Sequence, residues 1–191
     1  DLVEQYLQVA EALDGFGTHA PLYVSFQGTL DTALLPDPQD SASLQSPLLL
    51  LNVDRHSPHR GTIRPVQWEY QETATEWEPE HLLAVAPVWG YPLRPNTTYA
   101  LVLTTQVASY ATEFPDVWSA NHPDHAHYAD TQDTLFQLGL SVLDVAVATV
   151  FSTQSTTAEL AAFSQLISGG SLSLPALDQE LTLWDQSLWC K

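Results

Sequence analysis

Apolar and more polar residues alternate with a period of two along several short stretches of this chain. Leu22, Val24 and Phe26 alternate in this way, which predicts a half-buried first strand. The continuous apolar run over residues 48–53 has the length of a buried strand. Further strands are predicted at 63–70, 81–87, 99–105 and 144–151. Pro65 favours an edge position or a bulge near the start of one of them.

Three other segments carry apolar residues at helical spacing. Residues 2–13 predict a short helix or a loose lead-in, which is followed by glycines. A second helix is predicted to open at Pro123 and to end at Gly139. A third follows residues 156–159, Thr-Thr-Ala-Glu, whose spacing is typical of a capping box. The pattern therefore predicts a mainly β fold with two helices added toward the C-terminal end.

Residues 93–99 have the pattern Leu-x-Pro-x-Thr-x-Tyr and run directly into a predicted strand. This segment resembles the tyrosine corner of immunoglobulin-like and fibronectin-type β-sandwiches. The resemblance implies that the ring of Tyr99 is buried and that its hydroxyl bonds to the backbone a few residues upstream. The residues expected to have this structural role are Leu93, Pro95, Thr97 and Tyr99. The expected fold class is an immunoglobulin- or fibronectin-like β-sandwich.

The predicted elements divide the chain into three parts. Residues 1–19 form a lead-in segment. Residues 20–153 form the sandwich, with a helical insertion near 122–139. Residues 154–191 contain a helix and either a linker or the start of a further domain.

Composition and charge narrow the range of partners. The chain has 191 residues, of which 45% are hydrophobic, and this is enough to bury a core. Its 23 acidic and 5 basic residues give a formal net charge of -18, which repels nucleic acid and anionic membranes and excludes nucleic-acid binding. No segment has the roughly 20 continuous apolar residues of a transmembrane helix. Cys190 is the one cysteine, so no internal disulfide is expected.

Three segments, in this order, resemble one protein family: residues 13–22, 92–103 and 148–154. The family is the virulence-factor lipase N-terminal family, the immunoglobulin-like module of large bacterial extracellular lipases and esterases. In such proteins the catalytic part is a downstream α/β-hydrolase whose nucleophile lies in a Gly-x-Ser-x-Gly elbow. Residues 139–143 and 169–173 both begin like that elbow but lack its closing glycine. The resemblance therefore carries over no catalytic residue and no cofactor.

The resemblance implies a non-catalytic accessory module of a secreted bacterial lipase or esterase. The module would support or target a downstream hydrolase domain or chain, in a secreted or cell-envelope location. The chain begins at Asp1 and contains no Met, which is expected of a mature product or an excised fragment. The alternative is an independent extracellular binding or adhesion module for carbohydrate or a divalent metal.

The metal hypothesis comes from the polar stretch 122–130. Imidazole and carboxylate groups suit zinc, copper or nickel, and the candidate ligands are His122, Asp124, His125 and His127. The competing interpretation is a solvated helix entry, where Asp and His commonly gather. A second small cluster, His56 and His59, is interpreted as part of a surface loop in which Asp54 pairs with Arg55 or Arg60.

The carbohydrate hypothesis comes from residues 68–80, where five glutamates surround three aromatic residues. Aromatic faces stack on sugar rings, and carboxylates bond to sugar hydroxyls or transfer protons in glycosidases. The competing interpretation is an edge strand and an acidic loop whose tryptophan rings cover the core. The aromatic residues concerned are Trp68, Tyr70 and Trp77.

Overall fold

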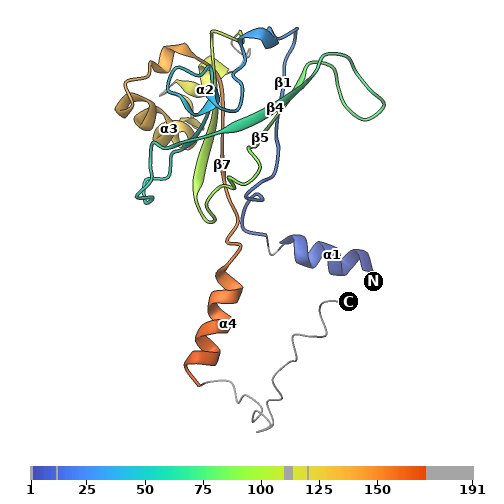
Figure 1. Cartoon of the computed structure of the whole chain (residues 1–191), viewed down its shortest axis with the longest axis vertical. Coiled ribbons are helices and arrows are strands. Elements are labelled where there is room, and N and C mark those ends of the chain that lie inside the picture. The colour runs from blue at the N-terminus through green and yellow to red at the C-terminus, as the bar shows by residue number, and fades with distance from the viewer. Residues whose placement is uncertain (1, 12, 110–113, 120, 171–191) are drawn as a thin grey trace, which may run out of the picture. The chain divides into compact units, whose positions relative to one another are not determined.

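The computed structural model describes residues 2–11, 13–109, 114–119 and 121–170 of the chain (Figure 1). It divides into two compact units, Asp1–Thr156 and Thr157–Lys191. The expectations for residues 171–191, Cys190 included, lie outside the described residues. Among the described helices, none has both the length and the apolar character needed to cross a membrane.

The described part of the first unit contains seven strands and three α-helices. The strands are β1 (Leu22–Ser25), β2 (Leu48–Asn52), β3 (Ile63–Arg64), β4 (Val66–Gln71), β5 (Leu82–Pro87), β6 (Thr98–Thr104) and β7 (Val145–Ser152). The helices are α1 (Leu2–Glu11), α2 (Phe114–Trp118) and α3 (His125–Gln137). Short 3₁₀ turns lie at Thr32–Leu34, Asp40–Ala42 and Val142–Asp144. In the second unit, the described residues contain the helix α4 (Ala158–Ser168).

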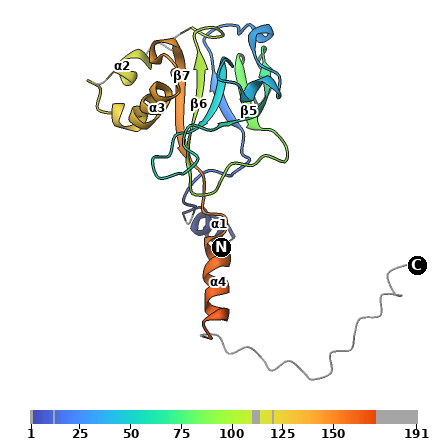
Figure 2. The same ribbon diagram turned by 60° about the vertical axis from the view of Figure 1, so that its left-hand side comes forward.

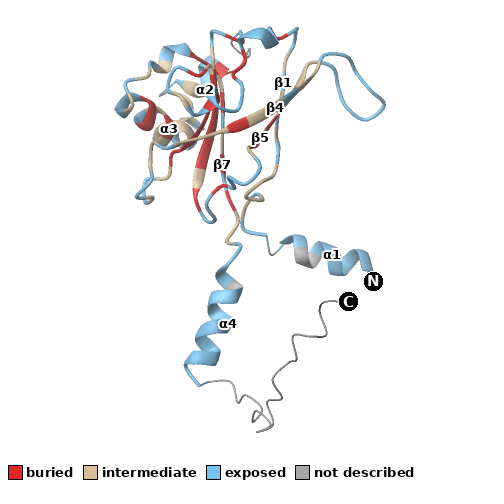
Figure 3. Cartoon of the chain, viewed as in Figure 1, coloured by how far each residue is buried: buried red, intermediate tan, exposed pale blue. Residues whose placement is uncertain are grey.

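The strands form two antiparallel sheets, and the expectation of a mainly β protein is confirmed. One sheet has the order β1-β5-β4 and the other β3-β2-β6-β7. Figure 2 shows β6 and β7 running side by side. Figure 3 shows that buried residues are concentrated in the strands.

The apolar run predicted as a buried strand is β2, and all of its residues are buried. Its side chains point alternately to two cores, because successive residues of a strand face opposite sides of the sheet. Leu48 and Leu50 pack between the two sheets. Leu49 and Leu51 pack on the outer face with residues of α2 and α3, such as Leu135. A run buried on both faces has no polar face, which explains why the sequence shows no alternation here.

One predicted strand, 63–70, proves to be two strands in different sheets. β3 pairs with β2, whereas β4 pairs with β5. Pro65 lies between them, where the chain crosses from the four-stranded to the three-stranded sheet, and its carbonyl accepts a hydrogen bond from Val88 N–H (3.0 Å). Proline cannot donate to a strand ladder, so the pairing stops at this residue.

The predicted helices are present; α1 begins at Leu2, as the pattern predicted, whereas α3 and α4 begin at other residues than predicted. α3 begins at His125, after Pro123, and the residue that follows its C-cap is Gly139, with a positive φ of 74°. α4 begins at Ala158, and its N-cap is Thr157, whose side chain makes no capping hydrogen bond. The predicted capping box at residues 156–159 is therefore wrong, because the helix begins one residue later than that box requires.

Candidate functional site

The three segments that carry the family resemblance meet at one end of the first unit, close to its last residue, Thr156. We call residues 14–18, 93–99 and 151–155 the exit junction. Backbone hydrogen bonds join the three segments: Phe16 N–H to Ser152 O (2.8 Å), Gln154 N–H to Phe16 O (2.9 Å), Leu93 N–H to Thr18 O (2.8 Å) and Asn96 N–H to Gln154 O (3.2 Å). Segments far apart in sequence are therefore held in one hydrogen-bonded unit.

Tyr99 lies in the middle of this junction. Its side chain is 1% exposed, and its hydroxyl oxygen accepts a hydrogen bond from the backbone N–H of Arg94 (3.1 Å). The ring stacks on that of Phe151, with centroids 6.2 Å apart, and so links the start of β6 to the end of β7. The contact of the hydroxyl with the backbone five residues upstream is of the kind expected for a tyrosine corner.

The other expected corner residues lie around Tyr99. Leu93 is buried in the core between the sheets. The hydroxyl of Thr97 donates to the carbonyl of Pro95 (2.9 Å), and its backbone N–H donates to the hydroxyl oxygen of Thr153 (3.1 Å). The Thr153 hydroxyl in turn donates to the carbonyl of Arg94 (2.6 Å). The buried side chain of Thr153, the residue after β7, thus bonds to two backbone groups of the corner. The sequence of the corner itself does not indicate this contribution.

Gly15 gives the closest backbone approach in the junction. A Cβ atom at this position would lie 2.7 Å from three backbone atoms, Gln154 N, Ser152 O and Thr153 C. Glycine is therefore required by tertiary packing, since a side chain would collide with backbone that cannot rotate away. The sequence pattern indicated only a helix stop here.

Asp14 holds Ser155, the last residue of the exit junction. Its carboxylate accepts hydrogen bonds from the Ser155 backbone N–H (2.9 Å) and from the Ser155 hydroxyl. The hydroxyl first, and then the backbone N–H, hold the pKa of Asp14 below its ordinary value of 3.8, because both donors stabilise the charged form.

We expect Asp14→Asn to destabilise the protein at neutral pH and to have no such effect in strong acid. A folded-state pKa below the unfolded value gives a stabilisation that is fully present above pH 3.8 and is lost as the pH falls through the folded pKa. Urea unfolding of both proteins in a descending pH series measures this. Ser155→Ala should shrink the same pH-dependent difference, and a difference that persisted below the folded pKa would contradict the assignment.

The His-rich stretch forms the entry to α3. The ring Nδ1 of His122 accepts a hydrogen bond from the Asp124 backbone N–H (3.2 Å), and Nδ1 of His125 lies 3.2 Å from the carbonyl oxygen of Trp118. His127 lies in the first turn of the helix. Within the described residues, no group of three His, Cys, Asp or Glu side chains is placed to hold a metal ion. The metal hypothesis therefore rests on the sequence pattern alone.

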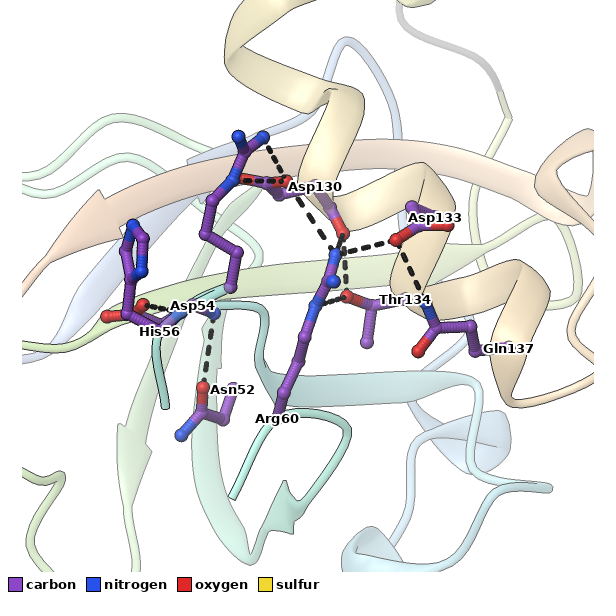
Figure 4. Close-up of polar contacts among 9 residues, drawn as sticks. Asn52, Asp54, His56, Arg60, Asp130, Asp133, Thr134 and Gln137 are labelled. Atoms are coloured by element: carbon purple, nitrogen blue, oxygen red, sulfur yellow. Dashed lines mark hydrogen bonds and ion pairs between the residues drawn. The ribbon is translucent and has the colours of Figure 1, made fainter. Parts of the chain in front are cut away.

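Arg60, in the loop between β2 and β3, links that loop to α3 through hydrogen bonds and an ion pair (Figure 4). Its Nε donates to the Thr134 hydroxyl oxygen (3.0 Å), and its Nη2 donates to the Asp130 carbonyl (3.0 Å) and pairs with the Asp133 carboxylate (3.0 Å). Arg55 pairs with the Asp130 carboxylate (2.7 Å), whose hydrogen bonds and charge raise the pKa of the guanidinium. Arg60, whose side chain is largely buried, thus positions the helix against the sheet, whereas the more exposed Arg55 forms a surface ion pair.

The predicted pairing of Asp54 with an arginine is wrong. Its carboxylate instead accepts hydrogen bonds from the backbone N–H groups of His56 (2.8 Å) and Thr98 (3.2 Å). An Asp side chain in a turn commonly accepts hydrogen bonds from nearby backbone N–H groups, and both guanidinium groups are bonded to α3 instead. The arginines find their acidic partners on α3, 70 or more positions later.

Replacing Arg60 with methionine is expected to lower the free energy of unfolding by about 1–2 kcal/mol, because charge-assisted hydrogen bonds of a 20% exposed side chain are lost. Arg55→Met is the matched control: its side chain is 60% exposed, and the change should be close to undetectable. Urea unfolding compares the two variants, and faster amide exchange in α3 of the Arg60 variant checks the cause. Equal effects of the two substitutions would contradict the anchoring role.

The aromatic and acidic stretch separates into a packed part and an exposed part. The Nε1 of half-buried Trp68 donates to the carbonyl of Pro36 (2.7 Å), and Tyr70 packs against the core between the sheets. Trp77, in the loop between β4 and β5, is 86% exposed. The interpretation that the tryptophan rings cover the core thus holds for Trp68 and is wrong for Trp77.

The described part of the first unit is a β-rich module of two antiparallel sheets with helices on the outer face of one of them. No family model, curated protein or solved structure matches the chain. Evidence on function therefore comes from the residues and their contacts.

Proposed function

We propose that the first unit is an immunoglobulin-like, non-catalytic accessory module of a secreted bacterial lipase- or esterase-type hydrolase. The strand order supports the immunoglobulin-like part. In such sandwiches strands B, E and D share one sheet, and C, F and G share the other, with C′ beside C in some of them. The order β1-β5-β4 corresponds to B-E-D, and β3-β2-β6-β7 corresponds to C′-C-F-G. Tyr99 then lies near the start of strand F, which is the position of a tyrosine corner.

The exit junction is the observation that carries the hydrolase part of the proposal. The three segments on which the family resemblance rests are far apart in sequence, yet they contact one another through Phe16, Tyr99 and Phe151. A set of motifs that forms one tertiary contact supports a shared architecture more strongly than three separate matches do. The junction also stiffens the backbone next to Thr156, which suits a module that supports whatever follows it.

The residues that resemble a nucleophile elbow support a non-catalytic role. The sequence around Ser141 lacks the closing glycine, and the Ser141 hydroxyl oxygen accepts the Leu143 N–H (3.2 Å) at the start of a 3₁₀ turn. A serine that caps a turn has a structural function and lacks the strained strand-to-helix geometry of an elbow.

The intact mass of the native protein, with sequencing through its C-terminus, tests the proposal. We expect the natural chain to continue beyond Lys191 and to contain a Gly-x-Ser-x-Gly segment. A natural chain without that segment would overturn the hydrolase part. Hydrolysis of a short-chain ester by the purified 191-residue chain, abolished by one serine substitution, would overturn the non-catalytic part.

A second candidate function is carbohydrate binding or adhesion, which the exposure of Trp77 favours. An exposed indole ring beside carboxylates offers a stacking face for a sugar. Calorimetric titration with a glycan panel measures such binding, and Trp77→Ala should abolish it. The control is Trp89→Ala, since Trp89 is also exposed, at 75%, but lies in a different loop. Equal loss of glycan binding in both variants, or no binding at all, would exclude this role of Trp77.

The metal alternative is tested separately, by titrating zinc into the protein and into its His127→Ala variant.

A further inference from the structure

β7 is a long edge strand with an unusual composition. It has eight residues, Val-Ala-Val-Ala-Thr-Val-Phe-Ser, with no charged residue and no proline. Within the described part of the chain it pairs with β6 on one side, and on its other side there is a single parallel bridge, between Phe16 and Thr153, the residue after β7. Natural proteins usually protect such edges, because the free N–H and C=O groups are a template for another strand.

The other sheet edges of this unit carry such protection. β3 has two residues and is followed by Pro65. β1 has four residues and is preceded by Pro21. β4 carries Glu69 and leads into the acidic loop. Short length, proline and charge all disfavour pairing with a further strand, so β7 is the exception.

The direction of the free backbone groups follows from the bonds at the end of β7. The Thr153 N–H donates to Thr97 O in the direction of β6, whereas Ser152 O and Gln154 N bond to Phe16 on the open side. Alternate residues of a strand direct their hydrogen-bonding groups to the same side. The N–H and C=O groups of Ala148 and Val150 therefore point to the open side.

Two hollows flank β7, and both are lined by a mixture of apolar and polar groups. One, of about 330 Å³, lies beside Val147, and the apolar part of its lining includes Val24, Phe26 and Leu30. The other, of about 750 Å³, lies between residues 149–152 and the first turn of α3, and the polar part of its lining includes Asp124 and His127. Side chains of a strand alternate between its two faces, so a strand added to β7 would direct one set into each hollow.

We propose that the open edge of β7 binds an extended segment of another protein by strand addition. The segment has apolar side chains at alternate positions, for the hollow beside Val147, and polar or basic side chains between them. Main-chain hydrogen bonds to Ala148 and Val150 provide the affinity, and the two hollows select the side chains. The formal charge of -18 disfavours a second copy of this chain and favours a segment without acidic residues. The inference does not depend on the proposed hydrolase.

The test uses the full chain and a synthetic peptide of about ten residues, in which valine alternates with threonine and lysine. We expect saturable binding by NMR titration, with slower hydrogen exchange at the Ala148 and Val150 amides. The same peptide with N-methyl groups at alternate residues should not bind, because it keeps the side chains but loses the N–H donors. Absence of binding, or equal binding of both peptides, would overturn the proposal.

Thr149→Lys tests the edge itself. Thr149 is exposed, so the substitution leaves the core intact, and a charge in the middle of an edge disfavours strand pairing. We expect at least a roughly tenfold weaker peptide affinity, against no change for the control Thr73→Lys in the loop after β4. Equal affinity of the two variants would overturn the assignment of the site.

Two further outcomes would assign the edge to a different occupant and overturn the proposal. Sedimentation detects a dimer of the free chain, and a dimer that Thr149→Lys dissociates would show that a second copy occupies β7. Slow exchange of the Ala148 and Val150 amides in the free monomer would show that the edge is already paired within the chain.

Discussion

Tyr99→Ala is expected to lower the free energy of unfolding by about 3–5 kcal/mol, the range for removing a buried aromatic ring. The ring is 1% exposed, stacks on Phe151 and fills the core at the exit junction, so its loss leaves a cavity in the core between the two sheets. The hydroxyl also satisfies the Arg94 N–H, which would lose its partner. Urea unfolding followed by tryptophan fluorescence measures the change.

Two matched variants separate the contributions of Tyr99. Tyr99→Phe keeps the ring and removes the hydroxyl, so we expect a loss of about 1 kcal/mol. Tyr91→Ala removes an exposed ring and should change stability by no more than about 0.5 kcal/mol. An unchanged stability of the phenylalanine variant would contradict the hydrogen bond to Arg94 and, with it, the tyrosine corner.

Gly15→Ala is expected to lower the free energy of unfolding by about 2–3 kcal/mol, the upper range for overpacking. The new Cβ would lie 2.7 Å from the Gln154, Ser152 and Thr153 backbone, so two backbone segments must separate. This separation weakens the hydrogen bonds between Phe16 and β7. Thermal and urea unfolding measure the loss, and amide exchange at Gln154 reports whether the junction has opened.

Gly28→Ala is the control for this substitution. A Cβ at Gly28 would meet no atom within 4 Å, and its φ is outside the left-handed region. We expect this variant to be neutral or more stable by up to about 1 kcal/mol, because alanine reduces the conformational freedom of the unfolded chain. A similar loss in both variants would point to a general intolerance of alanine and would contradict the close contact at Gly15.

The two largest predicted effects both fall in the exit junction, where residues 14–18 and 93–99 enclose the end of β7. If the proposed accessory role is correct, loosening this junction should impair the whole protein without touching any catalytic group. A Gly15→Ala variant of the natural full-length protein would then lose thermal stability of its activity, while its activity at low temperature would change little. The reverse pattern would argue against a supporting role.

Local patterns determined much of the fold, because burial on one face leaves a periodic trace in the sequence. The alternation at Leu22, Val24 and Phe26 predicted β1, and the uninterrupted leucines at 48–51 predicted β2. The pattern Leu-x-Pro-x-Thr-x-Tyr predicted the contact of Tyr99 with upstream backbone, since both partners lie within five residues. Each of these inferences needed information from one short stretch of chain.

Only the tertiary structure decided which stretches meet. Hydrophobic periodicity reports that a face is buried and says nothing of its partner, so Pro65 could be placed at an irregularity but not at a crossover between sheets. In the same way, the sequence pattern at Gly15 indicated only the end of a helix, whereas the structure shows the Gln154 backbone packed closely against it. The partners of Arg60 lie on α3, 70 or more positions away. Contacts of this range depend on how the sheets pack, which no local pattern encodes.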